Sequence, residues 1–163
     1  MSSSKPRNDA EQRLLASAIR YAGTGVRSSR QVLALLRRAG ASSREAQRLV
    51  AACRARGLVD DRASTRLWAE QWARRGYAWS AIRVKLSGKG FADGDIVAAA
   101  RHLGTTADDA ARAREVAASS RRRVPRATAQ RLARLLASRG FDADLIEHVV
   151  AESCGSPASH AEC

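Results

Sequence analysis

The sequence predicts an all-α protein made of three tandem three-helix, helix-turn-helix-like repeats, which form an elongated, curved array. Two observations lead to this fold class. The 163 residues are rich in alanine and arginine, which both favour helix, and runs of alternating β-branched residues are missing. The chain also matches itself at an offset of 50 residues, so one structural unit recurs along it.

The repeated unit consists of two helices joined by a glycine turn. Three stretches align without gaps: 32–50, 82–100 and 132–150. They share a glycine at the same place: Gly40, Gly90 and Gly140. Before this glycine, apolar residues such as Ile82 and Leu86 stand four apart, which places them on one face of a helix. Glycine then adopts the left-handed conformation that ends a helix, and apolar residues four apart resume in the next helix.

Polar residues that can cap the second helix follow each turn glycine. They are Ser42 or Ser43 in the first copy, Asp93 in the second and Asp142 in the third. After the first repeat, Gly57 is expected to end one helix, and Asp60 or Asp61 to cap the next. A metal or catalytic role for this carboxylate pair is the minor interpretation, because no histidine lies nearby in the sequence.

A further helix precedes each pair, in the ranges 10–22, 62–75 and 107–119. The expected repeats are therefore 10–57, 60–104 and 107–153, between a disordered N-terminus at 1–9 and a flexible tail at 155–163. A flexible link is expected at 119–127, where four arginines surround Pro125. Trp68 and Trp72 stand four apart, and packing is favoured for them over a stacking platform for bases.

The net charge of +13 is unevenly distributed. Residues 1–90 carry 19 Lys/Arg and 6 Asp/Glu, a difference of +13, whereas residues 91–163 carry 10 of each. This asymmetry indicates a polyanionic partner, with nucleic acid the first candidate. The alternative is a compositional bias toward arginine on solvated helix faces. The candidate contacts are Arg37, Arg38, Arg74, Arg75, Arg83, Lys85 and Lys89, of which the last five are expected to form one basic surface on the central repeat.

The sequence gives no support for catalysis or for a bound cofactor. The stretch 88–96 contains Gly-Lys-Gly and Asp-Gly-Asp, but it lacks the first glycine and the hydroxyl residue of a phosphate loop. It also lacks the terminal glutamate of a calcium loop. The three histidines are scattered without a nucleophile at diagnostic spacing. A zinc site from His148, Cys154, His160 and Cys163 is a minor possibility, because their spacing is unlike that of structural zinc sites.

The cellular location expected from the sequence is the cytoplasm. The three cysteines show no C-x-x-C spacing, which fits a reducing compartment. No apolar stretch approaches the roughly 18 residues of a membrane span, and the N-terminal residues have no apolar signal core.

Several motifs, taken together in order, resemble the RecX family, bacterial regulators of the RecA recombinase. The resemblance runs from about Leu14 to Val150 and rests on "RSSRQVLALLRRAG", "ARGLVDD", "LWAEQWARRGYAWSAIRVKLSGKGF" and "AQRLARLLASRGFDADLIEHVV". The positions that match the family pattern are Gly57 to Asp61, Arg74, Arg75, Ile82, Leu86, Lys89, Gly90 and Phe91. The family usually has an aromatic residue where this chain has Ala63, Ser64 and Thr65, and Trp68 can supply the missing bulk.

The resemblance implies a non-enzymatic, monomeric modulator that lies in the groove of the RecA–single-stranded DNA filament. There it would block filament growth or favour disassembly, and so lower ATPase, strand-exchange and co-protease activity. The implied partners are RecA and single-stranded DNA, with weak, salt-sensitive binding to duplex DNA. The second hypothesis is a helix-turn-helix regulator of transcription that binds double-stranded DNA, because such proteins also join two helices by a short glycine turn.

Overall fold

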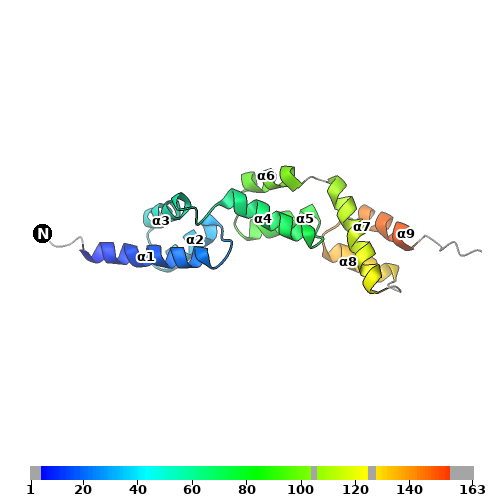
Figure 1. Cartoon of the computed structure of the whole chain (residues 1–163), viewed down its shortest axis with the longest axis horizontal. Helices are drawn as coiled ribbons and strands as arrows, with labels where there is room; N and C mark the ends of the chain where they lie inside the picture. Colours follow the sequence, from blue (N-terminus) through cyan, green and yellow to red (C-terminus); the bar gives the residue numbers. More distant parts are fainter. Residues whose placement is uncertain (1–4, 104–105, 125–127, 155–163) are drawn as a thin grey trace, which may run out of the picture. The chain divides into compact units, whose positions relative to one another are not determined.

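The computed structural model describes residues 5–103, 106–124 and 128–154, which form nine α-helices and no strand (Figure 1). The helices are α1 (Lys5–Gly23), α2 (Ser29–Arg38), α3 (Ser43–Ala55), α4 (Asp61–Arg74), α5 (Trp79–Gly88), α6 (Asp93–Leu103), α7 (Thr106–Arg123), α8 (Ala129–Ser138) and α9 (Ala143–Cys154). The all-α fold class is confirmed. None of these described helices is both long and apolar enough to cross a membrane.

Two helices extend into segments that were expected to be irregular. Helix α1 begins at Lys5, within the N-terminal segment 1–9, and Pro6 is accommodated because proline fits the first turn of a helix. Helix α7 continues to Arg123, within the expected link 119–127, because its Ala-, Ser- and Arg-rich sequence has no helix breaker before Pro125. The remainder of that link, 125–127, and the tail 155–163 lie outside the described residues.

Five helices end in the same glycine turn. The glycines, all with positive φ, are Gly40, Gly57, Gly76, Gly90 and Gly140. At Gly90, for example, the glycine N–H donates to the Ser87 carbonyl (2.8 Å), and the next N–H, of Phe91, donates to the Leu86 carbonyl (3.3 Å). This pair of bonds defines the Schellman motif, and the buried ring of Phe91 follows it.

The helix caps follow the sequence pattern with one exception. The capping side chains are Ser42, which accepts the Glu45 N–H (3.3 Å), Asp60, which accepts the Ala63 N–H (2.9 Å), and Asp142, which accepts the Leu145 N–H (2.8 Å). In α6 the position before the helix belongs to Ala92, and Asp93 is the first helical residue. Asp93 therefore lies one residue past the expected cap position, where its charge still favours the helix N-terminus.

The chain forms two compact units, which are divided inside α4, α5 and α6. Unit 1 consists of Met1–Leu67 and Leu86–Ala99, and unit 2 of Trp68–Lys85 and Ala100–Cys163. The core of unit 1 lies among α1, α2 and α3, and the core of unit 2 lies among α7, α8 and α9. Since the division into two units passes through the middle three helices, the three-repeat organisation and its boundaries stay a prediction.

Unit 1 contains a joint, called here the first joint, at the N-terminus of α2. The fully buried Ser28 donates its hydroxyl to the backbone carbonyl of Lys89 (2.7 Å). The Ser29 N–H donates to Asp61 Oδ1 (2.7 Å), and Arg54 pairs with the second oxygen of Asp61 (3.2 Å). Residues far apart in the sequence thus supply partners for the otherwise unsatisfied N–H groups that begin a helix.

Unit 2 contains the corresponding second joint, at the N-terminus of α5. The Ala78 N–H donates to the backbone carbonyl of Arg139 (3.0 Å), and the Trp79 N–H donates to both oxygens of Asp109 (3.0 and 3.1 Å). Arg112 forms an ion pair with Asp109. Ala78 and Arg139 each lie 50 residues after their counterparts Ser28 and Lys89, so the two joints obey the same offset as the sequence repeat.

Close approach in both joints requires the turn glycine. A Cβ on Gly90 would lie 2.7 Å from Cδ of Arg30, and a Cβ on Gly140 would lie 2.6 Å from Cβ of Ala81. A Cβ on Gly40 would meet nothing within 4 Å. Gly90 and Gly140 thus serve both the helix end and the joint, and the second role was not visible in the sequence.

Candidate nucleic-acid interface

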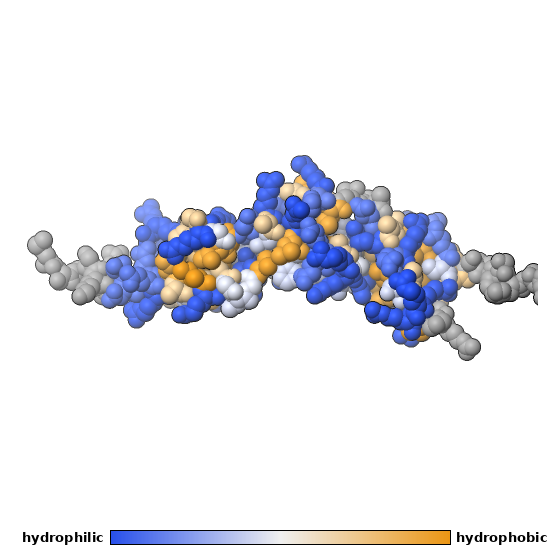
Figure 2. Space-filling view, viewed as in Figure 1, coloured by the Kyte–Doolittle hydropathy of each residue, from blue (hydrophilic) through white to orange (hydrophobic). Residues whose placement is uncertain are grey.

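Unit 2 carries a basic cleft of about 600 Å³ between the end of α4 and the helices α7 and α8. Six arginines line it: Arg74, Arg75, Arg112, Arg123, Arg131 and Arg139. One acidic residue, Glu115, lies among the described lining residues, and Val116, Val124 and Leu135 supply an apolar wall. The face drawn in Figure 2 is mostly hydrophilic, with smaller hydrophobic patches.

A glycine turn brings the end of α4 against α7. Gly76 has a φ of 77°, and its N–H donates to the Ala73 carbonyl (2.8 Å). A Cβ at this position would overlap the side chain of Val116 on α7. The turn can therefore approach α7 only because residue 76 is glycine, and this approach places Arg74 and Arg75 at the edge of the cleft.

Three of the six arginines are held by neighbouring groups. Arg139 donates from Nη1 to the backbone carbonyl of Arg75. Arg112 is paired with Asp109, and only 15% of each of these two side chains is exposed. Arg74 lies 3.8 Å from Glu70 on the same helix. Of these contacts, the bond from Arg139 joins two walls of the cleft, and the other two lie within a single helix.

The other three arginines, Arg75, Arg123 and Arg131, are exposed. Their guanidinium groups form no ion pair or hydrogen bond within the part of the chain that the structure describes. Three exposed cations that line one cleft and have no ion-pair partner among the described residues can each form a forked pair of hydrogen bonds with a phosphate or a carboxylate.

Tyr77, the aromatic residue among the described lining residues of the cleft, packs with two cations. The guanidinium of Arg139 lies 5.0 Å from the centre of the Tyr77 ring, and the ammonium of Lys85 lies 4.6 Å from it. Trp68 and Trp72 stack on each other with ring centres 5.2 Å apart, and Trp72 is only 7% exposed. These contacts agree with the expectation that the tryptophan pair serves packing.

The structure places four of the sequence-predicted contact residues in unit 2. Arg74 and Arg75 line the cleft, Lys85 covers Tyr77, and Arg83 is exposed on α5. Lys89 belongs to unit 1, so the single surface of five cations stays a prediction. Burial lowers the pKa of Lys89, and the positive charge of Arg27 lowers this pKa further.

The remaining two predicted contacts, Arg37 and Arg38, are exposed at the end of α2 in unit 1. Arg37 donates to the Ser43 hydroxyl, and Arg38 Nε donates to the Ala34 carbonyl (3.3 Å). Arg37 thus joins the end of α2 to the first residue of α3, and Arg38 supports the end of its own helix.

The sequence did not reveal four arginines of the cleft: Arg112, Arg123, Arg131 and Arg139. Residues 91–163 are neutral overall, but this sum includes acidic side chains outside the cleft, such as Glu152, which pairs with Arg114 (2.9 Å). Two signals pointed to the missing residues. The arginine run at 121–123 is one, and the 50-residue offset that makes Arg139 the counterpart of Lys89 is the other.

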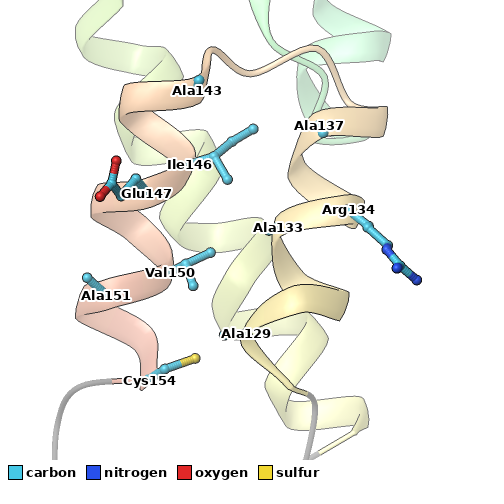
Figure 3. A pocket seen from close by; sticks show the side chains of 10 residues that line it. All are labelled: Ala129, Ala133, Arg134, Ala137, Ala143, Ile146, Glu147, Val150, Ala151 and Cys154. Atoms are coloured by element: carbon cyan, nitrogen blue, oxygen red, sulfur yellow. The ribbon is translucent and has the colours of Figure 1, made fainter.

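A second hollow lies on unit 2 between α8 and α9, with a volume of about 810 Å³. Figure 3 shows Ile146 and Val150 pointing from α9 toward α8, where Ala133 and Ala137 leave room for them. Two charged side chains among its described lining residues, Arg134 and Glu147, point away from this apolar groove (Figure 3).

No group of three potential metal ligands occurs among the described residues. Of the minor zinc set, His148 lies 3.0 Å from Glu152, and the Cys154 sulfur accepts a hydrogen bond from Arg121 (3.5 Å). His160 and Cys163 lie outside the described residues.

The fold and the cleft thus define an all-helical protein with a concentrated basic surface, and comparison with known proteins specifies the fold. No protein-family model matches the sequence, and no curated protein sequence matches it. The crystal structure of RecX from Lactobacillus salivarius is similar with a TM-score of 0.73 at 16% identity, over 91% of this chain and 99% of that one. A crystal structure of regulatory protein RecX is similar with a TM-score of 0.70 at 19% identity, over 88% of this chain and 74% of that one. The chain has the RecX fold.

Proposed function

We propose that the chain is a member of the RecX family and a non-enzymatic regulator of the RecA recombinase. The observation that carries this proposal is the similarity of fold to RecX over 91% of the chain. The residues that resemble the family pattern support it, because they hold the architecture together. Asp61 and Gly90 lie in the first joint, and Leu86 and Phe91 are buried around the same turn.

The proposed action is binding to the RecA–single-stranded DNA filament in the cytoplasm, as a monomer. Binding in the helical groove of the filament would block its growth or promote its disassembly, and so inhibit ATP hydrolysis by the recombinase. Exposed arginines such as Arg75 and Arg83 would approach the phosphates of the filament without reading its bases.

The charge of the helices argues against the transcription-regulator hypothesis. A helix-turn-helix protein inserts the first residues of its second helix into the major groove. In α6 the first turn contains Asp93 and Asp95, and in α9 it contains Asp144. These carboxylates would lie close to the phosphates of duplex DNA and be repelled by them.

The test is a titration of RecA ATPase activity on single-stranded DNA with this protein at less than one copy per recombinase subunit. The expected result is a progressive fall in the rate of ATP hydrolysis. An unchanged rate across the titration would refute the proposal.

A matched pair of variants tests the role of the basic residues. Arg74→Gln/Arg75→Gln/Arg83→Gln is expected to weaken inhibition with unchanged helicity. Arg44→Gln/Arg56→Gln/Arg62→Gln removes the same charge from exposed sites in unit 1 and is expected to inhibit like the unmodified protein. Equal inhibition by both variants would exclude the proposed contacts.

A further inference from the structure

We infer that the basic cleft of unit 2 binds the phosphodiester backbone of a nucleic-acid strand directly, through Arg75, Arg123 and Arg131. This inference rests on the proposed function, since it names the ligand chemistry that would attach the protein to a nucleoprotein filament. It predicts binding without the recombinase, so the two proposals can fail separately.

The first argument is that some arginines of the cleft are bonded to neighbouring groups and others are not. Arg139 and Arg112 are tied to the Arg75 carbonyl and to Asp109, so they shape the cleft and keep it positive. Arg75, Arg123 and Arg131 come from three different elements and have no acidic partner among the described residues. The one carboxylate among the described lining residues, Glu115, pairs with Arg122 (3.0 Å). Neighbouring cations without ion-pair partners cost the folded state electrostatic energy, and a bound polyanion removes that cost.

The second argument is the geometry of the cleft. The three arginines come from the turn after α4, the end of α7 and the first turn of α8, so the cations line different walls of one cleft. A chain of regularly spaced charges can contact cations on several walls at once. A guanidinium fork matches the two free oxygens of a phosphodiester, and the wall of Val116, Val124 and Leu135 can lie against the sugars.

The third argument is that the cleft lacks two of the features with which proteins recognise bases. The Tyr77 ring already carries the cations of Lys85 and Arg139, so it does not offer a free platform for stacking a base. No asparagine or glutamine, the side chains that pair with adenine, lies among the described residues of the cleft. The cleft thus offers neither a free stacking ring nor an adenine-pairing side chain among its described residues, and its arginines are expected to bind phosphate.

The expected size of the effect follows from counterion release. For single strands, the slope of log K against log salt is about −0.7 per neutralised phosphate, so three contacts contribute a slope of about −2. Between 50 and 200 mM salt this contribution alone weakens binding about 20-fold.

The experiment measures fluorescence anisotropy of a labelled oligothymidylate with the full chain, without recombinase, at several salt concentrations. The variant Arg75→Gln/Arg123→Gln/Arg131→Gln is expected to bind more weakly, with a salt slope shallower by about 2. Arg44→Gln/Arg56→Gln/Arg62→Gln, with the same net charge, is expected to keep the slope of the unmodified chain. The corresponding Arg→Lys variant of the three cleft residues is expected to retain the slope, which shows that charge and not folding is responsible.

Equal slopes for the cleft variant and the control variant would overturn the inference, because binding would then follow net charge alone. Tighter binding of polyglutamate than of oligothymidylate to the cleft would also overturn it in favour of an acidic protein partner. Equal affinity for oligothymidylate and oligoadenylate supports it. Duplex DNA that competes through the same three arginines supports the same phosphate chemistry. If the chain binds oligothymidylate through the cleft but leaves recombinase ATPase unchanged, the proposed function fails and the inference stands.

Discussion

Gly140 offers a direct test of the second joint. Its φ of 83° lies in the left-handed region, and an alanine Cβ there would lie 2.6 Å from Cβ of Ala81 and 3.3 Å from the Ser80 hydroxyl. Gly40 has a similar φ of 94°, but its added Cβ would meet nothing within 4 Å. The pair Gly140→Ala and Gly40→Ala therefore separates the contact in the joint from the strain of the turn.

The two contributions can be estimated separately. A left-handed conformation costs an L-residue about 1–2 kcal/mol, and this cost applies to both variants. Forcing an extra methyl group into a closely packed contact costs about 1–3 kcal/mol, and this cost applies only at residue 140. We expect Gly40→Ala to lower the free energy of unfolding by about 1–2 kcal/mol and Gly140→Ala to lower it by about 2–5 kcal/mol.

Urea unfolding followed by far-UV circular dichroism measures both values. Adding Ala81→Gly to Gly140→Ala removes the opposing methyl group, and a double-mutant cycle then isolates the contact. Glycine in a helix costs about 1 kcal/mol by itself, which the Ala81→Gly single variant measures. A favourable coupling of about 1–3 kcal/mol is expected. If Gly140→Ala is no more destabilising than Gly40→Ala and the coupling is zero, the joint does not constrain this glycine.

Three further predictions concern individual groups. Asp109→Asn removes the charge of the carboxylate that binds the Trp79 N–H and Arg112, and is expected to lower the free energy of unfolding by about 1.5–3 kcal/mol. The adjacent Asp108→Asn, in the same helix turn, serves as the control. Equal effects of the two substitutions on urea unfolding would contradict the second joint. In a Cys163→Ser background at pH 8, the exposed Cys154 is expected to react rapidly with a thiol reagent. Cys53 is buried, which raises its pKa, and it is expected to react only after the protein unfolds. Rapid modification of Cys53 in the native state would contradict its burial. The hydrogen bond and charge of Arg114 lower the pKa of Glu152. The contribution of this pair to stability is therefore present above the usual glutamate pKa and is lost as the pH falls through the lowered pKa. An NMR titration should show a higher pKa of Glu152 in Arg114→Gln, and an unchanged pKa would refute the pairing.

The helices and their turns could be predicted because their causes are local. Apolar residues four apart, such as Leu132 and Leu136, define a buried helix face, and both side chains are buried in unit 2. Gly140 ends the helix that they share, and Asp142 caps the next one. Each of these signals acts within a few residues, so the sequence contains it in readable form.

The joints could not be predicted, because their partners lie far apart in the chain. Ser28 and Lys89 are separated by 61 positions, and nothing in either neighbourhood indicates a bond between them. The sequence left Asp60 and Asp61 as alternative caps. The structure assigns the cap to Asp60, and it assigns Asp61 to Ser29 and Arg54 in the first joint.

The cleft was predictable only in part. Arg74 and Arg75 follow the buried face of α4, so their exposure could be inferred. Arg123 and Arg131 belong to a stretch that is neutral overall, and only folding separates these cations from the acidic side chains of the same stretch. Net charge along a sequence averages over faces of a helix that the folded chain keeps apart.

The two joints explain why a repeat reveals the architecture but not the site. At equivalent positions, the carbonyls of Lys89 and Arg139 both accept a bond from the joint, although the donor is the Ser28 hydroxyl in unit 1 and the Ala78 N–H in unit 2. The side chains at those two positions take no part in that bond, so the residue type can differ between the units. In unit 1 Lys89 faces the charge of Arg27, which adds to burial in lowering the pKa of Lys89. In unit 2 the counterpart of Arg27 is Tyr77, which accepts the guanidinium of Arg139 on its ring. Because the joint uses the backbone carbonyl at this position, the side chains on its surface can differ between the two units. In unit 2, Tyr77 and Arg139 are two of the residues that line the basic cleft.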